Sequence, residues 1–86
     1  MLHHIHEAVD VGVVFPARKL YPIPRWVHWR GQRYPVEEVH LVHERREGAI
    51  RYLVYSLTVG GTVVELRFDP EHARWYVDGI LDEEGP

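Results

Sequence analysis

Apolar and polar residues alternate with a period of two in the second half of the chain. In residues 62–68, three apolar side chains fall on one face, while Glu65 and Arg67 fall on the other and face water. This alternation predicts a strand with one buried face. Residues 50–59 are rich in Tyr, Val and Leu and predict the preceding strand, and Gly60-Gly61 between the two is a two-residue hairpin signal.

Shorter signals predict the remaining strands. Residues 11–15 are an apolar run that ends at a proline, residues 26–30 are aromatic and β-branched up to a glycine, and residues 75–81 follow a turn. The segment Arg30-Gly31-Gln32-Arg33 predicts a second tight hairpin, in which Gly31 supplies the positive φ. Two prolines exclude a helix in residues 20–24 and predict an extended connector or a sheet edge there.

Residues 36–47 allow two interpretations. Val36, Val39, His40 and His43 have helical spacing, whereas Val39, Leu41 and His43 alternate as in a strand. The β-branched content and the flanking hairpins favour a long strand with a bulge. A helix over residues 37–46 is the alternative.

These elements predict an all-β fold, with that helix as the one helical alternative. Five to six strands in an antiparallel meander must curl into a small barrel-like or strongly bent sheet, because a flat sheet of this size leaves its edges open. We expect one β domain over residues 11–82. A His-rich segment over residues 1–10, in part disordered, precedes it, and an acidic tail over residues 83–86 follows.

Composition narrows the class of protein. A chain of 86 residues that is 45% apolar supports one domain with its own core, and the absence of cysteine excludes disulfides and thiolate chemistry. No signal peptide or apolar run of membrane-spanning length is present, so we expect a cytoplasmic protein without a membrane partner. Nine of the ten basic residues are Arg, a bias found in some thermophile families.

The charge is unevenly distributed. The net charge of −3 argues against a strongly basic nucleic-acid-binding protein, but residues 1–34 hold five basic residues against two acidic ones. Aromatic residues are interleaved with these cations, as on surfaces that stack bases and contact phosphates. The tentative nucleic-acid-binding residues are therefore Arg25, Trp26, Arg30, Arg33 and Arg51. In the competing interpretation Trp29 and Trp75 are core residues; Trp26 and Trp29 differ in parity, so one of them is expected outside.

Seven histidines are the most unusual feature of the composition. His40 and His43 form the weak alternative of a metal site, but on a regular strand they point to opposite faces, and zinc needs three or four ligands. We expect no cofactor. Catalytic residues are not evident either, since the acidic residues, Asp69 and Asp78 among them, read as solvated surface groups. A non-enzymatic protein is expected.

Three groups of residues form a pattern. The chain resembles a small bacterial family of unknown function whose members share W-x-G-x-x-Y-x-V-x-x-V, E-L-x-x-D and W-x-L-D, with Val77 here where those proteins have Leu. Some members are encoded near translesion DNA polymerase genes, which implies a DNA-repair context. The matching residues are Trp26, Trp29, Gly31, Tyr34, Val36, Val39, Gly61, Glu65, Leu66, Asp69, Trp75, Asp78 and Asp82.

The leading hypothesis from the sequence is a binding or accessory module that presents a curved β face to a partner, either another protein or single-stranded nucleic acid. The alternative is a structural homodimer formed by the sheet edge at residues 20–24.

Overall fold

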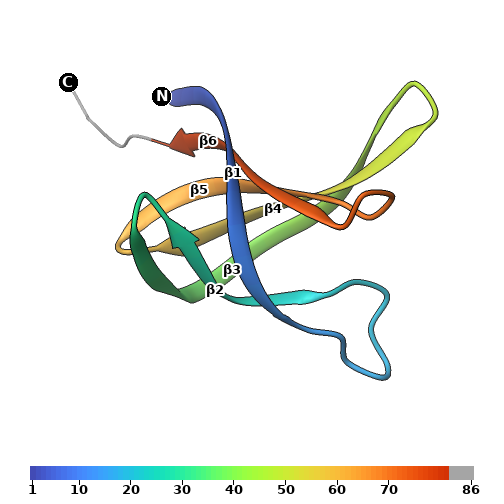
Figure 1. Ribbon diagram of the computed structural model, residues 1–86, viewed down its shortest axis with the longest axis horizontal. Helices are drawn as coiled ribbons and strands as arrows, with labels where there is room; N and C mark the ends of the chain where they lie inside the picture. The colour runs from blue at the N-terminus through green and yellow to red at the C-terminus, as the bar shows by residue number, and fades with distance from the viewer. Residues whose placement is uncertain (82–86) are drawn as a thin grey trace.

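The computed structural model describes residues 1–81, which form six strands and no helix (Figure 1). The acidic tail predicted for residues 83–86 lies outside the described residues. The strands are β1 (Leu2–Val14), β2 (Ile23–Trp29), β3 (Gln32–Glu47), β4 (Ile50–Val59), β5 (Thr62–Asp69) and β6 (Arg74–Leu81).

Each strand pairs antiparallel with the next one along the chain, and β1 also pairs with β6, which closes a ring of hydrogen-bonded strands. The predicted antiparallel meander with a barrel-like sheet is confirmed. Closure hides most strand edges, as expected for a sheet of this size. The helical alternative for residues 37–46 is wrong, because these residues lie within β3.

The ring is uneven because two long strands are shared between two sheets. The first part of β1, Leu2–Val9, pairs with β6, and Asp10–Val14 pairs with β2. In the same way Gln32–Pro35 of β3 pairs with β2, and the stretch from Val36 to Glu47 pairs with β4. A small sheet of β1, β2 and β3 therefore faces a larger one formed by β3, β4, β5, β6 and β1 (Figure 1).

The two predicted hairpins are present, and the first has its turn at Arg30-Gly31, within the predicted segment 30–33. Arg30 and Gly31 have φ of 53° and 78°, and Gly60 and Gly61 have φ of 55° and 74°. Two consecutive positive φ values match the twist of the flanking strands in a two-residue hairpin. The strained position falls on Arg30, whose side chain is held by a carboxylate described below.

The core lies between the two sheets. It contains the inward residues of β2, β4, β5 and β6, among them Val27, Tyr55, Leu66 and Val77, each with no exposed surface. Trp29 and Trp75 are buried, as predicted, at 9% and 8% exposure. The Tyr55 hydroxyl donates to the carbonyl of Pro22 over 2.5 Å, which fixes the end of the β1–β2 connection to the core.

Two strand boundaries differ from the sequence predictions. Strand β1 begins at Leu2, because residues 2–9 have β6 as a partner, although they show no clear period themselves. Strand β2 begins at Ile23 and includes the fully buried Pro24. Residues 23 and 24 pair with β1 on one side only, because the pairs between β2 and β3 begin at Trp26, which agrees with the predicted sheet edge.

Candidate binding surface

The outer face of the small sheet carries a stacked pair of side chains, Trp26 and Arg33. Trp26 of β2 lies opposite Gly12 of β1, and its indole occupies the space that a Cβ at Gly12 would need. Arg33 of β3 places its guanidinium carbon 3.9 Å from the centre of the Trp26 ring. A cation over an indole face at this distance is a favourable cation–π contact. Gly12, Trp26 and Arg33 therefore form a preorganised stack on the outside of the protein.

Arg25 lies next to this stack because of a bulge. Gly12 pairs with Trp26 and Val13 pairs with Pro24, which leaves Arg25 as the extra residue of β2. Arg25 is exposed, and within residues 1–81 no carboxylate contacts it or Arg33. Three of the five predicted nucleic-acid-binding residues, Arg25, Trp26 and Arg33, thus share one surface.

The other two predicted residues have different roles. Arg30 donates to both oxygens of Glu7, over 3.1 Å and 2.7 Å, and its guanidinium lies 4.7 Å from the Trp29 ring. The hydrogen bonds from Arg30, and next the one from Trp29, lower the pKa of Glu7 from 4.5 to about 2. Arg51 forms an ion pair with Glu44 at 3.0 Å. Both residues lie on the far part of the β3–β4 hairpin, residues 41–56, which we call the β3–β4 arm, away from Trp26.

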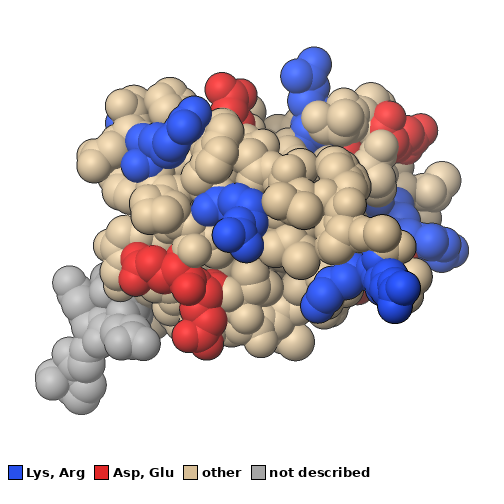
Figure 2. All heavy atoms as spheres, turned by 90° about the horizontal axis from the view of Figure 1, so that it is seen from below, with Lys and Arg blue, Asp and Glu red and all other residues tan. Residues whose placement is uncertain are grey.

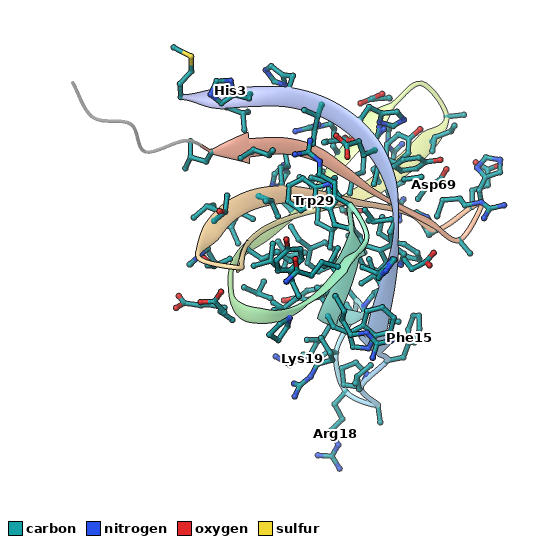
Figure 3. All side chains as sticks on the ribbon, turned by 60° about the vertical axis from the view of Figure 1, so that its left-hand side comes forward. His3, Phe15, Arg18, Lys19, Trp29 and Asp69 are labelled. Carbon is teal, nitrogen blue, oxygen red and sulfur yellow. The ribbon has the colours of Figure 1, made fainter. Side chains whose placement is uncertain are left out.

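Unpaired cations are concentrated near the small sheet. Among residues 1–81 four of the six basic side chains without a carboxylate contact precede residue 34. Arg18 and Lys19 lie on the β1–β2 loop beside Phe15, and Arg18 points away from the protein (Figure 3). Figure 2, seen from the side of this loop, shows the basic groups distributed over the face rather than in one continuous patch. The six are Arg18, Lys19, Arg25, Arg33, Arg46 and Arg74.

A shallow groove of about 490 Å³ lies beside the stack, with Ala8, Asp10, His28 and Arg30 in its lining. His28 is the cross-strand partner of both Asp10 and Arg33, so the groove continues the surface that carries Trp26. The sequence analysis missed Gly12 and His28. The alternation of side chains along β2 could have identified His28, because it lies two residues after Trp26 and shares its face.

His40 and His43 do not behave as on a regular strand. His40 is the extra residue of a bulge between Val39 and Leu41, and its Nε2 lies 2.7 Å from the Thr58 hydroxyl on the outer face. His43 pairs with Val54 and points to the same face, so the expected opposite orientation is wrong. Within the part of the chain that the structure describes, no three His, Asp or Glu side chains are grouped to hold a metal ion.

Two carboxylates expected in solvent are shielded. Asp69 is 6% exposed and accepts hydrogen bonds from the backbone N–H groups of Glu71 and His72 and from His72 Nδ1. Asp78 is 13% exposed and lies 2.8 Å from Arg67 Nε; Arg67, which was expected to face water, is equally shielded. Asp69 therefore stabilises the turn after β5, and Asp78 pairs with Arg67 in the outer layer of the large sheet.

Comparisons with protein-family models, with curated proteins and with solved structures gave no match. Residues 1–81 contain no helix long and apolar enough to cross a membrane.

Proposed function

We propose that this protein is a non-enzymatic binding module for single-stranded nucleic acid, and that the outer face of the small sheet contacts the strand. The observation that carries the proposal is the stack of Arg33 on Trp26, at 3.9 Å, outside the core. Trp26 is not needed to fill the interior, and Arg33 is not needed to neutralise a carboxylate. An Arg plane held on an aromatic ring offers a flat cationic surface on which a base can stack.

The charge distribution supports this assignment. Arg25 lies beside the stack, and Arg18 and Lys19 extend from the loop that leads into β2. Cations without intramolecular partners can neutralise phosphates without first breaking an ion pair, so they contribute most to the salt-dependent part of binding. With about three or four phosphate contacts, we expect modest affinity and a clear salt dependence at a net charge of −3.

The test is fluorescence anisotropy with labelled single-stranded DNA and RNA oligonucleotides over a series of salt concentrations. We expect saturable binding that weakens as salt rises. Trp26→Ala is expected to weaken binding by about 1–2 kcal/mol through lost stacking, and Arg33→Ala to weaken it and reduce the salt slope by about one unit.

Arg51→Ala is the matched control, because Arg51 is paired with Glu44 on the β3–β4 arm. If Arg51→Ala weakened binding as much as Arg33→Ala, the binding would depend on net charge alone. This result would overturn the assignment of this face. Absence of saturable binding at low salt would overturn the nucleic-acid proposal itself.

A further inference from the structure

Strand β3 has a backbone partner on one side only over most of its length. Strand β2 pairs with Gln32–Pro35, and every later pair of β3 is formed with β4. Apart from the strand ladders, the backbone hydrogen bond found within residues 1–81 is the one from Lys19 N–H to the Pro16 carbonyl. The backbone groups of β3 that point away from β4 after Val36 are therefore open to another strand.

The regular part of this edge lies on the β3–β4 arm. Register shifts interrupt the pairing of β3 before Leu41, but from Leu41 to Glu47 each residue pairs in turn with β4. Bulges discourage pairing with an added strand, so only this part suits one. The pairs between β4 and β5 begin at Leu53, and Figure 1 shows the end of the arm projecting from the rest of the protein. The outer end of β3 is therefore accessible.

Alternate residues of this edge direct their backbone groups outward. Glu47 and Ile50 flank a two-residue turn, and residues in that position are hydrogen-bonded to each other through the backbone. Because the direction alternates along a strand, Val42, Glu44 and Arg46 point their N–H and C=O groups away from β4. An antiparallel partner strand must pair with these groups.

A second copy of the chain can pair with this edge in few registers. Residues directly opposite in an antiparallel pair share a face, so a two-fold axis places one residue opposite its own copy, and its neighbours pair crosswise. An axis too close to either end meets a bulge or the turn after at most one further pair, which excludes Leu41, Val42, Arg46 and Glu47 as its centre.

Two of the three remaining axes give no complementary charges. An axis at His43 places Glu44 opposite the apolar Val42 of the copy. An axis at Glu44 places two carboxylates opposite each other at its centre and Arg46 opposite Val42. Like charges directly opposite each other are destabilising, and a charge opposite an apolar side chain gains nothing.

The axis at Arg45 makes the edge complementary to itself. Glu44 then lies opposite Arg46 of the copy, and this pair occurs twice because of the symmetry. Arg46 is exposed and has no carboxylate contact within the described residues, so the copy supplies the anion that its own chain does not. Arg45 meets its own copy at the centre, but it contacts Glu65 of its own chain at 3.5 Å, which compensates the charge.

The same register pairs the other face of the strand and brings a turn to a groove. His43 lies opposite Glu47 of the copy, also twice. Gly48 of the copy lies opposite Val42, which lines a groove of about 460 Å³ between β3 and the β1–β2 loop. The completely exposed Leu20 lines the same groove, so the turn of the copy approaches the apolar side chain that the chain itself leaves uncovered.

We propose that this protein forms a two-fold symmetric dimer in which residues 43–47 of β3 pair antiparallel with the same residues of a second copy, about an axis at Arg45. The two arms then form one continuous sheet in the order β4, β3, β3, β4. Pairing of an edge with itself closes the assembly at two copies, so no edge of this kind is left for a third.

The first test is sedimentation equilibrium of the full chain from about 10 µM to 1 mM. We expect a dimer with Kd of about 10–300 µM, because five residues on each strand form a small interface. Amide hydrogen exchange of Glu44 and Arg46 should slow as the protein concentration rises, since their N–H groups become paired. A chain that stays monomeric at about 1 mM would overturn the proposal.

The second test is a charge exchange that identifies the register. Arg46→Glu places two carboxylates opposite each other at both crosswise positions, and we expect it to weaken the dimer about tenfold. Arg51 lies directly opposite position 46 on β4, so this variant keeps a compensating charge within its own chain. The double variant Glu44→Arg, Arg46→Glu restores opposite charges and should recover the original Kd to within about threefold.

Arg33→Glu is the matched control, because it changes the net charge by the same amount on the outer face of the small sheet and should leave dimerisation unchanged. Equal weakening by Arg33→Glu and Arg46→Glu would mean that net charge alone acts, and would overturn the proposal. A dimer that Arg46→Glu leaves intact would place the contact elsewhere, such as the sheet edge at residues 20–24, and would overturn it as well. Trp26→Ala and Arg46→Glu change different surfaces, so this proposal and the nucleic-acid proposal can fail separately.

Discussion

Trp29 and Glu7 are joined by a hydrogen bond of 2.9 Å from the indole N–H to Oε1 of the carboxylate. Trp29 belongs to the core side of the small sheet, and Glu7 lies on the part of β1 that pairs with β6. Pairs between β1 and β2 begin only at Asp10, so no ladder joins Glu7 to the β2–β3 hairpin. Side-chain bonds from Trp29 and Arg30 hold this part of the ring together.

Removal of the Glu7 carboxylate should destabilise the fold. We expect Glu7→Ala to lower Tm by about 4–8 °C, because the partly buried Trp29 N–H loses its acceptor. Glu7→Gln should lower it less, since the amide oxygen can still accept from Trp29. The pKa of Glu7 is lowered from 4.5 to about 2, so its contribution is present above pH 4.5 and is lost as the pH falls towards 2. Thermal unfolding followed by circular dichroism at neutral and acidic pH measures both effects; equal Tm values for the two variants would contradict the assignment.

Removing only one member of the Arg67–Asp78 ion pair should destabilise the fold more than removing both. Nε of Arg67 lies 2.8 Å from Asp78 Oδ2, although its N–H is not aligned for a hydrogen bond, and both side chains are 13% exposed. Asp78→Ala leaves the shielded guanidinium with only the more distant carboxylate of Glu47, 3.9 Å away, and we expect a loss of about 2–4 kcal/mol in urea unfolding. The double variant Arg67→Met, Asp78→Ala should recover most of that loss. A double variant as unstable as Asp78→Ala would show that packing, rather than the unpaired charge, is decisive.

The turn after β5 should give a pH-dependent contribution to stability. Burial alone would raise the pKa of Asp69, but hydrogen bonds from His72 outweigh it and the pKa lies below 3.8. The same contact with Asp69 raises the pKa of His72 above 6.5. The pair therefore contributes fully between about pH 4 and 6.5. Its contribution is lost as pH rises through the raised pKa of His72 and as pH falls through the lowered pKa of Asp69.

His72→Gln measures this contribution. We expect the difference in Tm between the native protein and the variant to be largest within that window and to decrease on both sides of it. A difference that stays constant from about pH 3 to about pH 9 would contradict the ion pair.

Gly12 should control the position of Trp26. A Cβ at Gly12 would overlap the indole, so Gly12→Ala is expected to displace Trp26, to cost about 1–2 kcal/mol and to weaken oligonucleotide binding. In the Trp26→Ala background the same change should be neutral or stabilising, because Ala is favoured over Gly when no clash occurs. Urea unfolding of the four proteins gives this cycle. Equal effects in both backgrounds would contradict the contact.

The pattern of residues predicted the hairpins well and the shared strands less well. Gly60-Gly61 specifies its turn locally, because glycine adopts positive φ at both positions without strain. Gly31 indicates the other turn, but the positive φ of Arg30 is not a local preference. Residues 2–9 carry no strand period of their own, and they extend because β6 offers them a ladder. Pro24 predicts an extended connector or a sheet edge, and it pairs with β1 on one side only; the bulge beside it is a feature that a local pattern does not show.

The candidate site was likewise predicted only in part from the sequence. Parity alone indicated that one of Trp26 and Trp29 lies outside, and the structure places Trp26 there. Parity did not indicate that Arg30 would be bound to Glu7, a contact between residues 23 positions apart, or that Arg51 would lie on another arm. The separation of Arg25 and Arg33 from Arg30 and Arg51 depends on these long-range partners.

By itself the sequence determined the all-β class, the meander order, the hairpin turns and the identity of the core aromatics. Each of these follows from alternation and local backbone preference. Only the tertiary structure decided which charges are neutralised within the protein, where the ring closes, and which strand keeps a free edge. Those outcomes depend on how two long strands divide their pairing between the sheets, which arises from contacts between residues distant in the chain.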